Sequence, residues 1–321
     1  MKVGFYLKYK KNSINSRGNV VGDELYAESL CKSLRKIPGV LNAELFAPNY
    51  LPKEKIDLMV YLNDTKPQYR LAQKHILYFQ NTYSEIDVYK LVKKNQQINY
   101  DGYIFSSPRI LKIHESLGCR GIFLPFAVDL ELFYPQQKEE KYKYDVAYIG
   151  NDIKGSQYTT RYLAPAINYN FGLFGNWDSQ FRYRFWKNWK RQPEYKKIFK
   201  NLSKGKISKE DAASLYSNAK VSLNCSSQFC LDWDVVTGRT YDVLACKGFL
   251  ISDKVPTAQK YMDDCMVFTD GGEDLIAKID YYLKNEEERK KIAQRGYDYV
   301  VNNASMDIRA KDFFNYFKTI L

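Results

Sequence analysis

The feature that most constrains the fold of this chain is an alternation of short apolar runs with segments of helical periodicity. Apolar runs of this length, separated by helices or loops, are typical of buried parallel strands. Helices are expected at 22–37, where apolar residues recur at helical spacing, and at 107–118, which begins with Ser-Pro and ends at a glycine. The strand-like runs of this first part are 2–7, 43–48, 56–62, 75–81, 101–107 and 121–126.

A polar, charged stretch at 134–144 interrupts this alternation and is typical of an interdomain linker. Beyond it, a helix is expected at 208–219, where Ser208 and Asp211 form a capping box. Two successive halves of this kind predict an α/β protein with two doubly wound domains, 1–135 and 136–304, and a cleft between them. The strand-like runs of the second half are 145–150, 170–176, 220–225, 248–253 and 266–270.

The composition favours an acidic partner without choosing one. The 321 residues include 49 Lys and Arg against 37 Asp and Glu, which gives a net charge of +12. Phosphorylated small molecules, anionic lipid surfaces and nucleic acid all suit such a charge. The N-terminal apolar run is too short for a signal peptide and no stretch reaches the length of a membrane span, so a cytoplasmic protein is expected.

The cysteines do not predict a metal site or a disulfide framework. None forms a C-x-x-C pair, and the two histidines, His75 and His114, lie far from most of them in sequence. Reduced, buried thiols and structural histidines are the simpler interpretation. The cysteines are Cys31, Cys119, Cys225, Cys230, Cys246 and Cys265.

Polar residues follow the predicted strands of the second half, where ligands bind in doubly wound sheets. In the stretch TGRTYDVLACKGFLISD (237–253), Arg239 offers a planar fork of donors suited to a diphosphate. Asp242 can accept hydrogen bonds from both hydroxyls of a ribose, and a helix that starts near Gly238 would add its free N–H groups. The alternative is that Asp242 only stabilises a helix start and Arg239 is a solvated surface charge.

The same stretch resembles the nucleotide-sugar signature of the GT-B fold glycosyltransferases, in particular the CgeB-like branch of the group 1 glycosyl transferases. That signature reads R-x-F-E, then A-L-A-C-G, then an apolar strand that ends in Asp. Here it reads Arg239-Thr240-Tyr241-Asp242, followed by VLACKGFLISD. Four further segments resemble the family in the same order: 124–135, 145–151, 207–224 and 267–300.

The resemblance implies a GT-B fold, with two Rossmann-like doubly wound domains facing a cleft and a final helix, 305–321, that crosses back to the N-terminal domain. It implies a nucleotide-sugar-dependent glycosyltransferase of the hexosyltransferase type, acting with retention and without metal. The nucleotide-sugar, UDP- or GDP-linked, is a substrate, so no cofactor is expected. The acceptor is a glycan, a lipid-linked oligosaccharide or a protein.

The resemblance also implies roles for single residues. Asp242 stands where a Glu binds the donor ribose, and it is one methylene shorter. Arg239 would hold the diphosphate, and Asp234, on the first position of a paired-acid pattern, would lie near the sugar or its phosphates; these two are the expected catalytic residues. Asp234 closes the sequence DWD, but its match to the acid loop argues against a metal site. The other expected donor-binding residues are Gly150, Asn151, Arg161, Asn224, Gly238, Thr240 and Tyr241. A second departure from the family is Lys247-Gly248, which replaces a pair of small residues and crowds the turn.

The N-terminal domain is expected to bind the acceptor. The Gly- and Asn-rich loop 12–26 would let a ligand approach the backbone, although a plain surface loop explains it equally well. The stretch 78–85 follows a strand and would line the cleft. The expected acceptor-side residues are Gly18, Asn19, Gly22, Gln80 and Asn81.

The segment 181–201 mixes basic residues with aromatic ones. A helix whose aromatic residues pack inward explains it, and so does contact with an anionic membrane surface or a lipid-linked acceptor at the inner face of the membrane. Single-stranded nucleic acid is the least favoured partner. Two rival functions stay open: a basic membrane- or nucleic-acid-associated binding module on the same scaffold, and a nucleotide-sugar epimerase.

Overall fold

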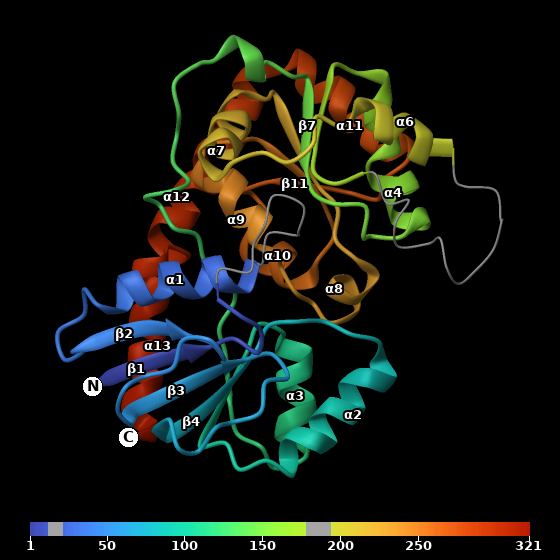
Figure 1. Cartoon of the computed structure of the whole chain (residues 1–321). Helices are drawn as coiled ribbons and strands as arrows, with labels where there is room; N and C mark the ends of the chain where they lie inside the picture. Colours follow the sequence, from blue (N-terminus) through green and yellow to red (C-terminus); the bar gives the residue numbers. More distant parts are fainter. Residues whose placement is uncertain (12–21, 178–193) are drawn as a thin grey trace. The chain divides into compact units, whose positions relative to one another are not determined.

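The structure is a computed structural model that describes residues 1–11, 22–177 and 194–321 of the chain. The chain forms two compact units. Figure 1 colours the chain along its sequence, from blue at the N-terminus to red at the C-terminus. The two main segments meet between residues 127 and 128, whereas the sequence predicted a boundary between residues 135 and 136. Unit 1 comprises Met1–Ala127, Trp233–Val235 and Ser305–Leu321, and unit 2 comprises Val128–Asp232 and Val236–Ala304.

Unit 1 is built on a six-stranded parallel sheet with the strand order β2-β1-β3-β4-β5-β6. The strands are β1 (Lys2–Tyr6), β2 (Asn42–Phe46), β3 (Ile56–Leu62), β4 (Ala72–Phe79), β5 (Gly102–Phe105) and β6 (Ile122–Phe123). The helices are α1 (Gly22–Leu34), α2 (Glu85–Gln96), α3 (Pro108–Ser116) and α13 (Met306–Ile320). The inner strands are buried on both faces, which explains why they read as continuous apolar runs.

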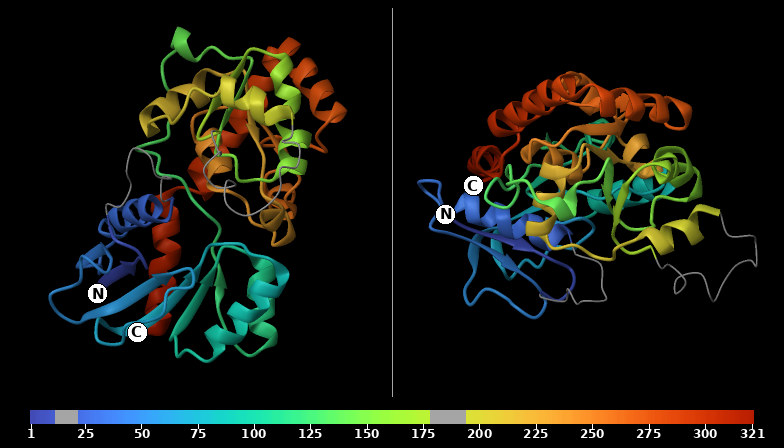
Figure 2. Two further views of the ribbon diagram at one scale, coloured as in Figure 1. Left: turned by 45° about the vertical axis from the view of Figure 1, so that its right-hand side comes forward. Right: turned by 90° about the horizontal axis from the view of Figure 1, so that it is seen from above.

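The last helix of the chain completes the core of unit 1. Helix α13 packs beside α1 on the sheet, as Figures 1 and 2 show from different sides. Its residues Phe313 and Phe317 are fully buried, and the Phe313 ring lies 5.2 Å from the ring of Tyr78 on β4. Residues far apart in the sequence therefore share one hydrophobic core.

Unit 2 is built on a five-stranded parallel sheet with the strand order β11-β10-β9-β7-β8. The strands are β7 (Val146–Ile149), β8 (Phe171–Phe174), β9 (Val221–Asn224), β10 (Leu250–Asp253) and β11 (Val267–Thr269). The α-helices are α4 (Ser156–Tyr162), α6 (Glu194–Leu202), α7 (Lys209–Asn218), α8 (Gln228–Asp232), α9 (Gly238–Ala245), α10 (Pro256–Tyr261), α11 (Glu273–Lys284) and α12 (Glu286–Asn303), and the 3-10 helices are η1 (Glu140–Tyr142) and η2 (Ala164–Asn168). The two parallel sheets confirm the predicted α/β class with two doubly wound domains.

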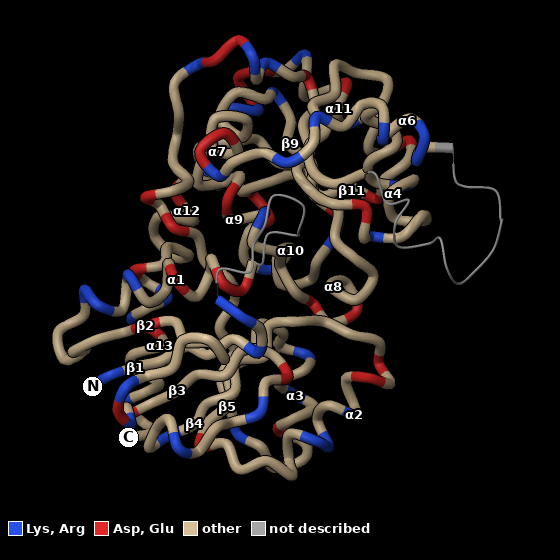
Figure 3. The backbone as a smooth tube through the Cα atoms, viewed as in Figure 1, with Lys and Arg blue, Asp and Glu red and all other residues tan. Residues whose placement is uncertain are grey.

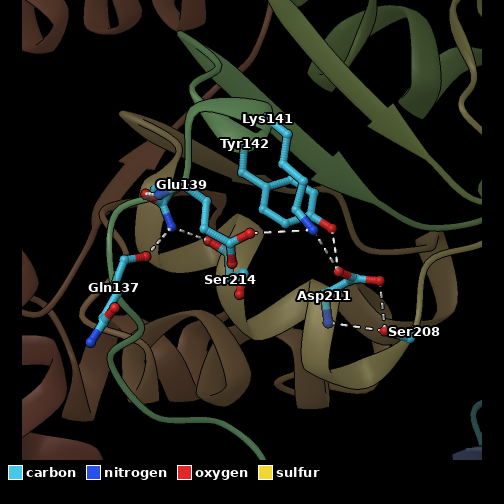
Figure 4. Close-up of polar contacts among 8 residues, drawn as sticks. Gln137, Glu139, Lys141, Tyr142, Ser208, Asp211 and Ser214 are labelled. Atoms are coloured by element: carbon cyan, nitrogen blue, oxygen red, sulfur yellow. Dashed lines mark hydrogen bonds and ion pairs between the residues drawn. The ribbon is translucent and has the colours of Figure 1, made fainter.

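The polar stretch 134–144 is not a free linker, because it is fastened to helix α7 within unit 2. The backbone N–H of Glu139 donates to Asn218 over 2.8 Å, and that of Gln136 donates to Ser217 over 3.0 Å. We call residues 134–144 the strap, and Figure 4 shows side chains that hold it. Tyr142 donates to Asp211 at the start of α7 over 2.5 Å, and Lys141 pairs with the same carboxylate. Each of these bonds is polar and joins residues far apart in the sequence, so apolar periodicity gave no sign of them.

Two further findings concern the remaining expectations. No helix of the described residues has the length and apolar character needed to span a membrane. All six cysteines are free; Cys119 and Cys230 are half-buried and the other four are buried. Of the segment 181–201, only its end is described: on α6, Tyr195 and Phe199 are buried in the core of unit 2, while the residues before Glu194 lie outside the described residues.

Candidate functional site

In the sheet of unit 2 the chain order reverses between β7 and β9, and the carboxyl ends of these two strands carry the candidate site. Such a reversal leaves a crevice outside the strand ends, which is where ligands bind in open α/β sheets. Arg239 spans this point: its Nε donates to the carbonyl of Ile149 at the end of β7, and its Nη1 donates to Oδ1 of Asn224 at the end of β9, both over 2.7 Å. Its guanidinium also lies 4.7 Å from the centre of the Tyr148 ring. These contacts hold the guanidinium in one orientation at the switch point, so it is not a freely solvated surface charge.

Helix α9 presents Arg239 and Asp242 on one face because they stand three residues apart. Thr240 and Tyr241 turn the other way and are 1% and 3% exposed. Asp242 is half-buried, and this burial raises the pKa of its carboxyl to about 7 against the attraction of Arg239 and Lys209. A carboxylate that is poorly solvated by water is suited to accept hydrogen bonds from the hydroxyl groups of a ligand. Thr240 and Tyr241, expected to bind the donor, instead pack α9 onto the unit.

The start of α9 leaves backbone donors available. Thr237 occupies the N-cap position without a side-chain bond to the helix, because its hydroxyl donates to Asn224 over 3.3 Å. Gly238 follows, and a Cβ built there would meet no heavy atom within 4 Å. The first N–H groups of a helix attract anions, and Gly238 itself places no side chain beside them.

A buried polar network fixes the ends of β9 and β10. Asp253 is fully buried and accepts hydrogen bonds from the backbone N–H of Ser226 over 2.5 Å and from its hydroxyl over 3.0 Å. Asn224 donates to Ser252 over 3.1 Å, so its oxygen faces Arg239. Burial raises the pKa of Asp253, while the bonds from Ser226 and Ser252 act the other way. The network therefore holds Asn224 in the orientation that positions Arg239.

Lys154 is a component that the sequence analysis missed. It lies in the loop after β7, and its pKa is lowered by burial and, next, by repulsion from Arg239, while Asp253 acts to raise it. Two basic side chains, from Lys154 and Arg239, therefore lie near one another at the strand ends. In a chain with 49 basic residues a single loop lysine carries no signal of its own, and only the tertiary structure identifies it.

The structure gives Gly150 and Asn151 structural contacts. A Cβ on Gly150 would lie 2.6 Å from the Tyr148 hydroxyl, so this turn has no room for a side chain. The Asn151 oxygen accepts the backbone N–H of Asn176 over 2.8 Å and ties the β7 loop to the β8 loop. Both residues border the strand ends as expected, and a contact with phosphate stays a prediction.

Arg161 is not brought together with the other predicted donor-binding residues. It stands exposed in the last turn of α4, where its Nε donates to the carbonyl of Asp270 just after β11. In the sheet, β10 separates β11 from β9, and neighbouring strands are about 4.8 Å apart. Its guanidinium supports the turn after β11 and does not join Arg239.

Asp234 belongs to unit 1 and not to the rim of unit 2 on which the sequence analysis placed it. The excursion Trp233–Val235 is fastened by long-range bonds: the Trp233 indole donates to the carbonyl of Tyr83 over 2.7 Å, and Ser107 donates to the Trp233 carbonyl over 2.5 Å. Asp234 is 8% exposed and adopts a left-handed backbone with φ 58°. It lies beyond the strand ends of β4 and β5, and its catalytic role stays a prediction.

Unit 1 has its own switch point between β1 and β3. Just after β3, Asn63 adopts a left-handed backbone with φ 59°, donates to Asp23 over 2.8 Å and accepts the backbone N–H of Asn81 over 2.9 Å. Burial raises the pKa of Asp23. The exposed Asn81 is at this edge, whereas Gln80 is 4% exposed and its amide has no partner among the described residues. Gly22 is the first residue of α1; Gly18 and Asn19 lie outside the described residues.

Both histidines are buried side chains of unit 1. His75 is 4% exposed, with its Nδ1 3.1 Å from the Tyr61 hydroxyl. His114 is fully buried, with its ring 4.5 Å from that of Phe105, and burial lowers its pKa to about 4. These contacts agree with the structural roles expected for both.

Comparison with known proteins is consistent with this geometry. Residues 158–315 match the family model described as "Glycosyl transferase-like". No curated protein sequence matches the chain. The match runs from within α4 to within α13 and includes α9 with Arg239 and Asp242. It does not identify the CgeB-like branch.

Solved structures match nearly the whole chain. The sucrose-phosphate synthase of Thermosynechococcus elongatus is 14% identical with a TM-score of 0.70, covering 99% of this chain and 98% of that one. BGT of T4 phage, in complex with its UDP-glucose substrate, is 16% identical with a TM-score of 0.63, covering 100% and 99%. HepE of Anabaena, in complex with UDP-glucose, is 10% identical with a TM-score of 0.65, covering 99% and 100%. At these identities the likeness establishes the fold alone, and it confirms the predicted GT-B fold.

Proposed function

We propose that this protein is a glycosyltransferase that takes a sugar from a nucleotide-sugar, UDP- or GDP-linked, and transfers it to a glycan, lipid-linked or protein acceptor. The observation that carries the proposal is Arg239, held across the β7–β9 switch point by Ile149 and Asn224. A fixed guanidinium fork at the strand ends of a doubly wound sheet suits a diphosphate. The match to "Glycosyl transferase-like" over 158–315 and the UDP-glucose complexes of BGT and HepE support the same reaction class.

In this proposal the donor lies along the start of α9. Arg239 and Lys154 neutralise the diphosphate, the first N–H groups of α9 add anion attraction, and Asp242 accepts hydrogen bonds from the ribose. The leaving group of the transfer is the nucleoside diphosphate, so positive charge at this point also stabilises the transition state. Because two protein cations supply that charge, the proposed reaction needs no divalent metal.

A nucleotide screen tests the donor site. UDP, GDP, ADP and TDP are compared by the rise in melting temperature of the full chain, and one of the uridine or guanosine nucleotides is expected to give the largest rise. Asp242→Ala and Arg239→Ala are expected to remove it, whereas Arg161→Gln, which alters an exposed arginine by β11, keeps it. If none of the nucleotides raises the melting temperature, or if both rim variants behave as wild type, the assignment is wrong.

Retention of the anomeric configuration is part of the proposal and has its own test. Proton NMR of the first product formed from an α-linked donor is expected to report an α-linked sugar. A β-linked product would overturn retention, and Asp23, a half-buried carboxyl at the switch point of unit 1, would then be the first base to substitute.

Product analysis with the same donor separates the rival functions. A transferase forms a glycosylated acceptor, an epimerase returns an isomerised nucleotide-sugar without any acceptor, and a binding module consumes no donor. We also propose a cytoplasmic enzyme that touches the inner face of the membrane through 181–201. Vesicles with and without anionic lipid test this, and equal sedimentation with both would contradict it.

A further inference from the structure

A cavity of unit 2 lies at the opposite edge of its sheet from the site around Arg239. It has a volume of about 640 Å³, within the range of pockets that hold small ligands. The residues just before four neighbouring strands line it: Phe249 before β10, Lys220 before β9, Asp145 before β7 and Asn170 before β8. We call it the amino-edge pocket.

Positive charge dominates this pocket. Two carboxylates, Asp145 and Glu286, also line it, and each forms an ion pair with a lining lysine: Lys220 to Asp145 over 2.7 Å and Lys290 to Glu286 over 2.8 Å. The basic residues along the backbone are marked in Figure 3. The lining basic side chains are Lys138, Lys143, Lys220, Lys247, Arg289 and Lys290.

Three of these cations have no carboxylate at ion-pair distance among the described residues: Lys138, Lys247 and Arg289. Glu286 is close enough to attract Lys138 and Arg289 as well as its partner Lys290, so one carboxylate faces three cations. Arg289 is only 9% exposed, and its Nη1 donates to the carbonyl of Tyr282. A cation buried to this extent is costly unless an anion balances it, and most of its N–H groups remain available.

The turn that carries Lys247 is an independent sign of a built site. Lys247 follows α9 in a left-handed conformation, φ 53°, where helices commonly place glycine. The next residue must be the glycine: a Cβ on Gly248 would lie 2.7 Å from the carbonyl oxygen of Tyr216. A left-handed backbone has a free-energy cost for a residue that carries a side chain, and the crowding expected from Lys247-Gly248 stays a prediction. The chain maintains this cost at the rim of the pocket, with the ammonium 4.8 Å from the centre of the Tyr297 ring.

The neutral groups of the pocket are already engaged within the protein. The Asn218 amide donates to the carbonyls of Gln137 and Ser214, and the Ser217 hydroxyl donates to Ala213 and Cys246. Recognition there rests on charge and not on neutral hydrogen bonds. A compact ligand with several negative charges fits these conditions best.

We propose that the amino-edge pocket is a second anion site, which binds a small soluble polyphosphate separately from the donor site at the strand ends. Lys138 and Lys247 contact the ligand from the strap and from the turn after α9, and Arg289 meets it from α12. The site needs neither the donor nor the transfer reaction.

Calorimetric titration with inorganic tripolyphosphate at low salt tests this proposal. The background variant is Arg239→Gln, which weakens phosphate binding at the donor site, so the remaining binding reports the pocket. Adding Lys138→Gln and Lys247→Asn is expected to weaken this binding about tenfold or more. Neither lysine leaves a carboxylate unpaired, and Asn tolerates the left-handed backbone, so the fold is expected to survive.

The matched control replaces Lys66 and Lys112, two exposed lysines of unit 1, by glutamine and removes the same charge. It is expected to change tripolyphosphate affinity less than twofold. The proposal is overturned if Arg239→Gln alone abolishes all binding, or if the pocket variant and the control weaken it equally. UDP binding to the pocket variant with Arg239 intact is expected to match wild type, which keeps this outcome distinct from a failure of the donor site.

Discussion

The two sheets solve the same topological problem with opposite chemistry. At the switch point of unit 1, Asn63 has a left-handed backbone, and its side-chain amide bonds to Asp23 and to the backbone after the next strand. At the switch point of unit 2, the polar side chains converge on Arg239, which neutral acceptors orient and which has no carboxylate at ion-pair distance in the part of the chain that the structure describes. The Asn63 amide is bonded to protein groups, whereas the Arg239 guanidinium keeps a positive charge that an anion could balance. We therefore expect the polar network to stabilise the edge of unit 1, and the oriented cation to make the edge of unit 2 the one that binds an anion.

Of the changes that test this comparison, substitution of Arg239 is expected to have the largest effect, on nucleotide binding. Arg239→Gln removes charge-assisted hydrogen bonds to the diphosphate and is expected to weaken nucleotide binding about 100-fold. Calorimetric titration with the nucleotide chosen by the thermal screen measures it. Asn63→Ala, at the corresponding point of unit 1, is the partner variant and is expected to leave the affinity of the folded protein unchanged. Equal losses in the two variants would erase the distinction between the edges.

Asn63 is expected to matter for stability instead. Asn63→Ala loses three hydrogen bonds and keeps a side chain in the left-handed region, which lowers the free energy of unfolding by about 3 kcal/mol. Asn63→Gly spares the backbone strain and is expected to lose about 1 kcal/mol less. Urea unfolding followed by circular dichroism compares them. If the two variants are equally stable, the left-handed backbone carries no cost.

Asp242 links binding to pH. Its folded pKa of about 7 lies above the ordinary value near 4, so the folded chain binds more protons between these limits and stability falls as pH rises through them. Asp242→Asn is therefore expected to raise the free energy of unfolding by about 1 to 2 kcal/mol at pH 8, after allowance for partial exposure, and by little at pH 4. Thermal melts at the two pH values measure this.

The same carboxyl predicts the sign for the ligand. Wild-type nucleotide affinity is expected to rise as pH increases through 7, because only the carboxylate accepts both ribose hydroxyls, and Asp242→Asn is expected to be weaker by about tenfold at pH 8 and flat with pH. A pH-dependent affinity that survives in the variant would assign the titration to another group.

The smallest effects are expected from alanine substitutions at two glycines that each begin a helix. Gly22 and Gly238 are the first residues of α1 and α9, and a Cβ on either would meet no heavy atom within 4 Å. Each glycine-to-alanine change is expected to stabilise the protein by about 0.5 kcal/mol. Only Gly238→Ala is expected to reduce nucleotide affinity, by a few fold, because the diphosphate approaches that helix start. Identical affinities would place the phosphate elsewhere.

Local patterns in the sequence predicted many of the strands and helices of the fold. Buried parallel strands leave continuous apolar runs, and Ser208 with Asp211 caps α7 as expected, with the Asp211 N–H donating to Ser208 over 3.0 Å. The same pattern, Ser84 with Asp87, begins α2 and was overlooked; of the apolar residues in this helix only Val88 and Val92 are buried. Helical spacing likewise predicted that Arg239 and Asp242 share a face.

What the sequence did not reveal depends on tertiary contacts. Lys154 gains its significance from Arg239 and Asp253, and nothing in its neighbours along the chain announces them. Trp233–Val235 leaves unit 2 for three residues, because Ser107 and Tyr83, more than a hundred positions away, bind it. Thr240 and Tyr241 lie inside the segment that resembles the family signature, but the helix turns both side chains into the packed face.

Helix α13 has a consequence for how the chain is made. Domains generally fold as units during synthesis, starting from the N-terminal side. Unit 1 contains the first residues of this chain, yet its core stays open until Phe313 and Phe317 have left the ribosome. Unit 2, whose residues are nearly all made earlier, can close first. Of the two units, the one whose translation begins first is therefore expected to complete its core last, and the part of its sheet that α13 covers stays exposed until the residues of unit 2 have been translated.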